Sequence, residues 1–342
     1  MSQLPIMILQ TLNLQNFRNY KQRSFSFSNN TTVIIGDNGA GKSNILEAIY
    51  LLGTGKSFRA EKDEQMILYG QEFGRVSACL RRQAASEVDL EVVLTKPKRF
   101  FINKAAKKMR DFVGQLNCVL FRPEDINLVL GSPSGRRAYL DSVLEPVDRE
   151  YRRCNLSYQK GLRQRNKLLE RIRDGEVNRN QLLFWDNLLI KNGTIISQKR
   201  EEFLSWLKLE YDPSRISPLR LNQYAREEVL AATTLVGPHR DDFRFIVQRP
   251  GKAAKDLSIY GSRGEQRMAV LGVKLGEFEF VWEKAGERPL LLLDDIFSEL
   301  DHENREGIFK LIKKQQTIIT TADKHLIPRN IKLDIKIINI EN

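Results

Sequence analysis

The segment that most constrains this chain is Gly36-Asp-Asn-Gly-Ala-Gly41-Lys42-Ser43, which fits the phosphate-loop pattern G-x-x-x-x-G-K-[ST] at every fixed position. The β-branched run 32–35 before it predicts a buried strand, and the apolar stretch 44–52 after it predicts a helix. A strand, a glycine loop and a helix start are the context that this motif requires, so the sequence predicts a nucleoside triphosphate site. The residues expected to line it are Gly36, Asp37, Asn38, Gly39, Ala40, Gly41, Lys42 and Ser43.

Within this loop, backbone N–H groups would surround the phosphate oxygens, Lys42 would reach the β- and γ-phosphates, and Ser43 would hold Mg²⁺. The tripeptide recurs at Gly55-Lys56-Ser57, but Tyr50 stands where the first glycine of a second loop is needed. That copy also follows a helix instead of a strand, so we reject it as a phosphate site.

Charge and composition narrow the class of protein. The chain has 342 residues, and its 55 lysines and arginines exceed its 43 acidic residues by twelve, which favours a polyanionic partner such as nucleic acid. Three scattered cysteines and three histidines form neither a disulfide framework nor a zinc pattern. No apolar run approaches the ~20 residues of a membrane span. We therefore expect a soluble, cytoplasmic protein with no membrane partner.

Strand-like runs lie at both ends of the chain and surround an arginine-rich helical middle, 134–210. This order predicts an α/β fold in which a mainly helical lobe is inserted into a discontinuous mixed-sheet lobe. We expect the first lobe to comprise residues 1–121 and 283–342, and the second to comprise 122–282. One apolar stripe at helical spacing is expected to be core: Leu182, Trp185, Leu189, Ile196, Phe203 and Leu207.

A second motif, made of two acidic residues, follows the fully apolar run 290–293. Asp294 is predicted to hold Mg²⁺ and Asp295 to orient or deprotonate an attacking water, as in other phosphate-loop proteins. Acids after a strand can also be plain loop residues, and the pairing with the phosphate loop favours the metal-binding interpretation.

The segment 260–267 opens another predicted helix, with Ser262 and Gly264 at an anion-binding N-terminus. Ser262 and Glu265 also fit an ordinary capping box, and both interpretations are compatible.

In order along the chain, the loop 36–43, Ser262-Arg-Gly-Glu-Gln266, Asp294-Asp295 and Ser298-Glu-Leu-Asp301 match the Walker A, signature, Walker B and D-loop motifs of ABC-type ATPase heads. Together with Asn16-Phe-Arg-Asn-Tyr20, Phe121-Arg-Pro-Glu-Asp-Ile126, the segment 131–141 and Gly237-Pro-His-Arg-Asp-Asp242, they make the chain resemble the RecF family, bacterial proteins related to the chromosome-structure-maintenance ATPases. The resemblance covers residues 8 to about 325.

The resemblance implies a phosphate-loop ATPase head of ABC type whose signature helix, at the end of the second lobe, faces a second copy. Two chains would sandwich two ATP molecules, with Lys42 of one chain and Ser262 of the other at each γ-phosphate. The resemblance also implies that Arg18, Gly264 and Gln266 contact the nucleotide. It implies that Lys42, Ser262 and Asp295 are the catalytic residues.

For function, the resemblance implies recombinational DNA repair and replication restart, within the DNA-damage and SOS responses. An ATP-dependent homodimer would clamp gapped or junction DNA and help to load the RecA recombinase together with RecO and RecR. Single- and double-stranded DNA are both expected partners.

Three positions depart from the pattern of ABC heads. Asp295 replaces a glutamate and is one methylene shorter, which predicts slow hydrolysis and a weak, DNA-stimulated ATPase that acts as a binding switch. The glutamine expected after Phe121 is absent, and 320–323 replaces the histidine of the switch strand. Two alternatives stay open: an ATP-driven motor or nucleic-acid-processing ATPase, and a transporter ATPase subunit.

Two basic runs, 96–110 and 152–173, are candidate DNA-binding surfaces, although such runs are often just solvated faces. The predicted contacts are Lys98, Arg99, Lys104, Lys107, Lys108, Arg152, Arg153, Arg163 and Arg165. Phe100 and Phe101 are expected to pack in a core. For Gly237–Asp242 we expect a turn with Arg240 paired to an aspartate, and not a catalytic His–Asp pair.

Overall fold

The computed structural model describes residues 7–82, 86–248, 253–298, 312, 315–322 and 335–341. The chain divides into two compact units, Met1–Asp125 with Glu277–Asn342, and Ile126–Gly276. This division falls at 125/126 and 276/277. The lobe boundaries at 121/122 and 282/283 stay a prediction.

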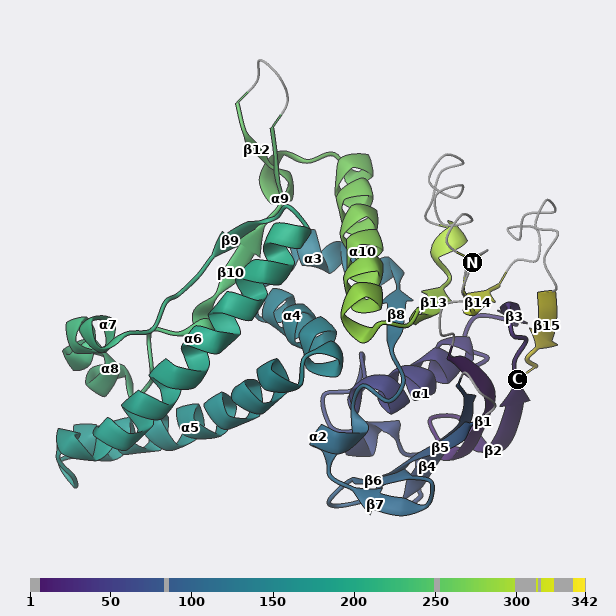
Figure 1. Cartoon of the computed structure of the whole chain (residues 1–342), viewed down its shortest axis with the longest axis horizontal. Coiled ribbons are helices and arrows are strands. Elements are labelled where there is room, and N and C mark those ends of the chain that lie inside the picture. Colours follow the sequence, from purple (N-terminus) through teal and green to yellow (C-terminus); the bar gives the residue numbers. More distant parts are fainter. Residues whose placement is uncertain are drawn as a thin grey trace. The chain divides into compact units, whose positions relative to one another are not determined.

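The first unit contains a five-stranded parallel sheet with the order β15-β3-β14-β13-β8 (Figure 1). Its strands are β3 (Thr31–Ile35), β8 (Cys118–Phe121), β13 (Leu290–Asp294), β14 (Thr317–Thr321) and β15 (Ile335–Asn339). Every residue of β3, β13 and β14 is buried, as expected for the centre of a parallel sheet covered on both faces. Because the strands are parallel, their carboxyl ends meet at one edge of the sheet.

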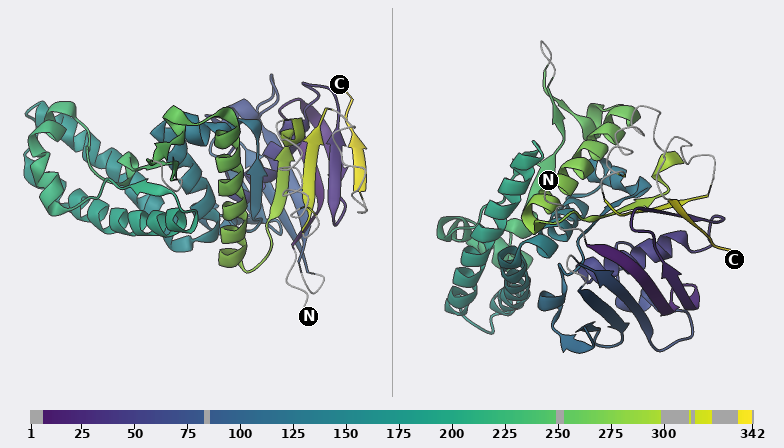
Figure 2. Two further views of the ribbon diagram at one scale, coloured as in Figure 1. Left: turned by 90° about the horizontal axis from the view of Figure 1, so that it is seen from above. Right: turned by 45° about the vertical axis from the view of Figure 1, so that its right-hand side comes forward.

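A second, antiparallel sheet of the first unit has the order β2-β1-β4-β5-β6-β7. Its strands are β1 (Ile8–Phe17), β2 (Tyr20–Ser26), β4 (Gly74–Arg81), β5 (Glu87–Leu94), β6 (Arg99–Ile102) and β7 (Ala105–Lys107). The helix α1 (Lys42–Thr54) contacts strands of both sheets, and Figure 2 shows it between them. Ile45, Leu46, Ile49 and Leu52 of α1 are fully buried, so one helix joins the two sheets into a single core.

The second unit is mainly helical. Its helices are α3 (Asn127–Leu130), α4 (Pro133–Val147), α5 (Arg149–Arg173), α6 (Leu183–Trp206), α7 (Pro218–Gln223), α8 (Ala225–Ala231) and α9 (Leu257–Tyr260). The long helices α5 and α6 pack along one another (Figure 1). Two small antiparallel sheets pair β9 (Glu210–Asp212) with β10 (Asp242–Arg244), and β11 (Ile246–Val247) with β12 (Lys255–Asp256).

The remaining elements are short or connect the units. The helix α10 (Arg263–Ala285) begins in the second unit and ends in the first. The helix α2 (Met109–Phe112) and five 3-10 helices complete the described chain: Asp63–Met66, Pro123–Ile126, Arg179–Leu182, Pro238–Arg240 and Ile296–Ser298. Within the described ranges, no helix is long and apolar enough to cross a membrane.

The predicted apolar stripe of the second unit is core, as expected. Its most buried members are Leu182, Leu189, Ile196 and Phe203, each at most 1% exposed. Phe100 is also buried and packs against the ring of Phe112 with centroids 5.0 Å apart, which confirms a core role for it.

Candidate nucleotide site

The loop 36–43 connects β3 to α1. At two of its positions the backbone has a conformation that only glycine adopts easily. Gly39 and Gly41 have φ values of 89° and 99°, in the left-handed region. A Cβ atom on Gly36 would lie 2.5 Å from the carbonyl oxygen of Ile340, so close backbone approach requires glycine there too. Helix α1 has no side-chain N-cap and no acidic residue in its first turn, which suits an anionic ligand at its N-terminus.

Lys42 lies folded across this loop. Its ammonium donates hydrogen bonds to the carbonyl oxygens of Gly36, at 2.7 Å, and Asp37, at 2.9 Å. Only 7% of the residue is exposed, so the side chain is held over the loop that the sequence assigns to phosphate.

The two predicted metal-binding residues lie side by side. The hydroxyl of Ser43 donates to Oδ1 of Asp294 at 2.9 Å, and the hydroxyl of Thr320 donates to the same oxygen at 2.7 Å. The parallel register that pairs Asp294 with Thr320 brings them to the sheet edge that also carries the phosphate loop. Hydroxyl and carboxylate oxygens are ligands that Mg²⁺ prefers, usually together with phosphates and water. No cluster of three His, Cys, Asp or Glu side chains suited to a metal occurs among the described residues.

Asp295 follows the strand in a left-handed conformation, with φ 48°. Its backbone N–H donates to the carbonyl and to the hydroxyl oxygen of Thr320, each at 3.2 Å. Asp and Asn tolerate this conformation better than longer side chains do, because their short polar groups bond locally. The structure thus gives a local reason for aspartate at a position where glutamate is usual.

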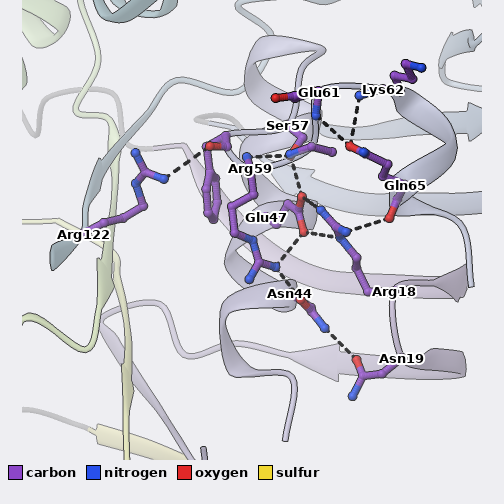
Figure 3. A network of polar contacts seen from close by, with 12 residues as sticks. Arg18, Asn19, Asn44, Glu47, Ser57, Arg59, Glu61, Lys62, Gln65 and Arg122 are labelled. Carbon is purple, nitrogen blue, oxygen red and sulfur yellow. Dashed lines mark hydrogen bonds and ion pairs between the residues drawn. The ribbon is translucent and has the colours of Figure 1, made fainter. Parts of the chain in front are cut away.

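Arg18 lies beside the site in the turn between β1 and β2, and its guanidinium is already bonded. It donates to both carboxylate oxygens of Glu47, at 2.7 and 2.5 Å, and to the carbonyl oxygen of Gln65, at 2.6 Å (Figure 3). These bonds use three of the five N–H groups of the guanidinium, and a direct contact of Arg18 with a nucleotide stays a prediction.

Three residues around the loop received no role from the sequence. Asn19 donates from Nδ2 to the carbonyl oxygen of Ala40 at 3.3 Å, and Tyr20 donates to that of Gly41 at 3.2 Å. Burial raises the pKa of Tyr20 to about 12, and nearby Arg23 opposes that shift, so its hydroxyl stays protonated and able to donate. The third residue is Glu47. Asn19 and Tyr20 belong to the motif Asn16-Phe-Arg-Asn-Tyr20, whereas no motif includes Glu47.

The signature segment begins α10 in the second unit. Ser262 is exposed, its N–H donates to Glu265 at 2.7 Å, and its hydroxyl accepts from the N–H of Glu265 at 3.3 Å, which confirms the capping box. The bond from the Ser262 N–H, with further help from Lys255, lowers the pKa of Glu265 to about 2. A Cβ on Gly264 would meet no atom within 4 Å, so this helix end is open to an approaching ligand or chain.

Gln266 differs from expectation. Its side chain is buried and donates to the carbonyl oxygens of Leu257, at 2.8 Å, and Gly261, at 3.3 Å. It therefore ties α9 to the first turn of α10, and the predicted nucleotide contact is corrected to a structural role. The predicted D-loop, 298–301, lies outside the described residues apart from the backbone of Ser298.

The basic run of the first unit forms the exposed hairpin β6–β7 and the residues after it. Arg99, Lys104, Lys107 and Lys108 are exposed. Lys98 instead pairs with Asp63 at 2.6 Å, and its side chain is only 12% exposed. Four of the five predicted contacts therefore lie where a polyanion could reach them.

Two predicted DNA contacts in the second unit are wrong. Arg165 is fully buried and bonds to Asp186, Thr234 and Glu228 at 2.7–2.9 Å. Arg152 is 6% exposed, and its Nε donates to the carbonyl oxygen of Glu145 at 2.6 Å. Arg153 and Arg163, in contrast, are exposed on the same helix.

The segment Gly237–Asp242 is a turn, as expected, but its partners are not those predicted. Asp241 pairs with Arg200 at 3.0 Å, and Asp242 accepts two bonds from Arg136, at 2.6 and 2.9 Å. Arg240 donates instead to the carbonyl oxygen of Thr234 at 3.2 Å. The predicted Arg240–Asp pair is therefore wrong, and the segment holds α4, α6 and β10 together.

Comparison with known proteins agrees with this geometry. The RecF/RecN/SMC N terminal domain matches residues 8–338. The DNA replication and repair proteins RecF of Bacillus cereus (strain G9842) and Bacillus thuringiensis (strain Al Hakam) are each 35% identical to the chain, over 98% of it and 97% of their own length.

Solved structures give the same result. The recombination mediator protein RecF of the RecFOR pathway, bound to ATP, superposes with a TM-score of 0.86 at 31% identity, over 94% of both chains. The Smc head domain of Pyrococcus furiosus, at 18% identity and a TM-score of 0.51 over 94% of this chain and 91% of its own, shares the fold. The predicted fold class, an ABC-type phosphate-loop ATPase head with a helical lobe, is thus confirmed, and the chain belongs to the RecF family.

Proposed function

We propose that this chain is an ATP-dependent DNA-binding protein of recombinational repair and replication restart. The observation that carries the proposal is the pairing of Ser43 with Asp294 beside the phosphate loop, because it assembles both protein ligands for an Mg²⁺–ATP complex. Relatives that cover nearly the whole chain are named for DNA replication and repair, and related solved structures contain ATP.

ATP would act by joining two copies. Lys42 and the loop N–H groups hold the triphosphate from one copy, and the exposed N-terminus of α10 at Ser262 approaches the γ-phosphate from the other. The open space at Gly264 supports such a close approach. RecO and RecR are the partners with which the dimer would help to load RecA.

DNA would be held through its phosphates. The exposed cations of the β6–β7 hairpin and of α5 supply charge without any evident base-reading motif, so binding would be independent of sequence and would weaken as salt rises. The side chains assigned to DNA are Arg99, Lys104, Lys107 and Lys108 on the first unit, and Arg153 and Arg163 on the second.

ATP hydrolysis would release the DNA. Asp295 is the proposed base or water-orienting group, and its short side chain predicts turnover too slow for a motor. ATPase activity then serves as a switch for DNA binding.

The test is fluorescence anisotropy of a labelled gapped duplex with ATP, with ADP and without nucleotide. The wild-type chain is expected to bind tightly only with ATP, and Ser262→Arg is expected to lose that binding while still binding ATP. Equally tight binding in all three nucleotide states would show that the basic surface acts without the composite site.

Two further variants separate the proposed contact from helix capping and from added charge. Ser262→Asp keeps an N-cap but places a carboxylate against the γ-phosphate, so it should also lose ATP-dependent DNA binding. Ser205→Arg adds the same positive charge as Ser262→Arg, but at an exposed position of α6, and should bind DNA as the wild type does. DNA-stimulated turnover above a few per second would favour the motor alternative.

A further inference from the structure

A buried carboxylate lies one helical turn after the phosphate loop. The side chain of Glu47, on α1, is 0% exposed and accepts four hydrogen bonds. Arg18 donates to both of its oxygens, Ser57 donates to Oε1 at 2.5 Å, and Arg59 donates to Oε2 at 2.8 Å (Figure 3). A buried charge is costly unless it is paired and fully hydrogen-bonded, and Glu47 meets both conditions.

These donors keep Glu47 ionised. Burial alone would raise the pKa of its carboxyl group, but the hydrogen bonds from Arg18, Ser57 and Arg59 outweigh burial and lower that pKa. At neutral pH the single negative charge of Glu47 therefore holds two guanidinium groups, those of Arg18 and Arg59.

The first guanidinium fixes the turn between β1 and β2. Arg18 has φ 55°, its N–H donates to the carbonyl oxygen of Met66 at 2.8 Å, and its side chain bonds to Glu47 and Gln65. The neighbouring Asn19 is thereby held over the phosphate loop, close to Gly41.

Asn19 is the residue through which this turn contacts the loop. Its amide lies 2.6–2.7 Å from where a Cβ atom of Gly41 would be, and it donates to the carbonyl oxygen of Ala40. The left-handed bend at Gly41, which starts α1, is therefore packed directly against the Asn19 side chain.

The second guanidinium closes a ring. Arg59 donates to Oδ1 of Asn44 at 2.5 Å, and Asn44 donates to Oδ1 of Asn19 at 2.8 Å. The connections run from Glu47 through Arg18 to Asn19, then through Asn44 and Arg59 back to Glu47 (Figure 3). This ring includes Asn44 and Glu47, which share one face of the first turns of the helix whose N-terminus receives the phosphates.

We propose that Glu47 is a positioning residue of the nucleotide site, which holds the Arg18–Asn19 turn against the backbone of the phosphate loop. The inference rests on the proposed ATP site. Without the carboxylate, two guanidinium groups lose their shared counter-charge, the turn is released, and the loop is no longer held in the shape that receives the phosphates.

If Glu47 only stabilised the fold through its ion pairs, substituting it would also weaken ATP binding. The two roles differ in how Glu47 couples to Asn19. If Glu47 acts on the nucleotide through the turn, removing the Asn19 side chain and removing the Glu47 charge disrupt one and the same contact. Their effects on ATP affinity are then not additive.

The experiment measures the Kd of the full-length chain for a fluorescent ATP analogue with Mg²⁺, at a temperature where circular dichroism shows every variant to be folded. Glu47→Gln and Asn19→Ala are each expected to raise Kd tenfold or more, with unchanged binding stoichiometry. The double variant should lie within about twofold of the weaker single variant. Glu91→Gln, the same change in a partly exposed pair with Arg75, should bind as wild type does.

An unchanged Kd for Glu47→Gln, or a double variant whose loss is the product of the two single losses, overturns the inference. If Glu47→Gln does not fold, Ser57→Ala removes one bond from the same carboxylate. It should raise Kd in the wild-type background and leave it unchanged in Asn19→Ala. A folded wild-type chain that fails to bind the analogue contradicts the proposed function, whereas wild-type binding with an unaffected Glu47→Gln contradicts only this inference.

Discussion

The hydroxyl of Ser43 lies 2.9 Å from Oδ1 of Asp294, although the two residues are 251 positions apart in the chain. Two features bring them together. Ser43 is in the first turn of a helix that follows one parallel strand, and Asp294 ends another strand of the same sheet. Because parallel strands end at a common edge, the carboxylate and the hydroxyl face the same point. A metal ion bound there would replace a hydrogen bond that already sets the spacing of its ligands.

Asp294→Asn should therefore abolish the contribution of Mg²⁺ to ATP affinity. The amide keeps the shape of the side chain and a bond to Ser43 but loses the charge that the cation needs. In a titration with a fluorescent ATP analogue, Mg²⁺ is expected to strengthen wild-type binding at least tenfold and to leave the variant unchanged. With EDTA, the two proteins should bind within about twofold of one another.

Asp111→Asn, at an exposed carboxylate of α2, is the matched control and should respond to Mg²⁺ as the wild type does. A variant at Asp294 that retains the full Mg²⁺ effect would rule out Asp294 as a metal ligand.

Asp295→Asn should separate ATP binding from hydrolysis. Asparagine tolerates the left-handed backbone at this position, so the fold should be kept, but it cannot accept a proton from water. Steady-state phosphate release is expected to fall about 100-fold or more, as for loss of a general base, while the Kd for ATP stays the same. The lifetime of the DNA complex in ATP, measured by anisotropy after adding competitor, should lengthen in parallel. Unchanged phosphate release would assign the base to another group.

The phosphate loop and the two aspartates were predictable because each depends on a short motif beside a recognisable strand. Gly39 and Gly41 indeed have the left-handed φ values that the motif requires. The ring around Glu47 was not predictable, since nothing local in the sequence relates Glu47 to Arg18 or to Asn19. Only the packing of a hairpin turn against a helix brings these side chains within hydrogen-bonding distance.

The two errors on α5 have a simpler cause. Buried residues of this helix recur every three or four positions, as in Tyr158, Gly161, Arg165 and Leu169. Arg165 therefore lies on the apolar stripe that faces the interior, and counting charges in the run 152–173 ignored that direction. Helical periodicity alone would have separated it from Arg163, although it could not have named the buried partners.

This contrast between neighbouring arginines gives a prediction. Arg163→Gln should weaken binding to gapped duplex and reduce the slope of log affinity against log salt concentration by about one, without changing Tm. Arg165→Gln should instead lower the free energy of unfolding by about 3–5 kcal/mol, because it leaves the buried carboxylate of Glu228 without its partner. Anisotropy at several salt concentrations and urea denaturation measure the two effects.

Lys208→Gln, at an exposed lysine beyond the end of α6, controls for loss of one positive charge and should leave the salt slope unchanged. If Arg163→Gln leaves the salt slope unchanged as well, α5 does not contact DNA phosphates.

The buried histidine of the second unit predicts how stability depends on pH. Nε2 of His239 bonds to the carbonyl oxygen of Thr234 at 2.9 Å and must carry the proton, so Nδ1 accepts from the hydroxyl of Tyr158 at 2.8 Å. The pKa of His239 is lowered from 6.5 to about 4, mainly by burial. The positive charges of Arg240 and Arg137 act in the same direction, while the Thr234 bond and the charge of Asp241 oppose the shift.

The folded chain thus keeps His239 neutral down to about pH 4, whereas the unfolded chain takes up a proton near pH 6.5. The contribution of neutral His239 to the free energy of unfolding is fully present above pH 6.5. It is lost as pH falls from 6.5 to 4, and the loss is at most about 3 kcal/mol. Urea denaturation of the wild type at pH 7.0, 6.0 and 5.0 should show this loss before the carboxylates titrate. His239→Gln, which cannot take up the proton, is expected to start less stable but to lose less over the same interval. Parallel pH profiles for the two proteins would show that His239 does not set the acid sensitivity of the helical unit.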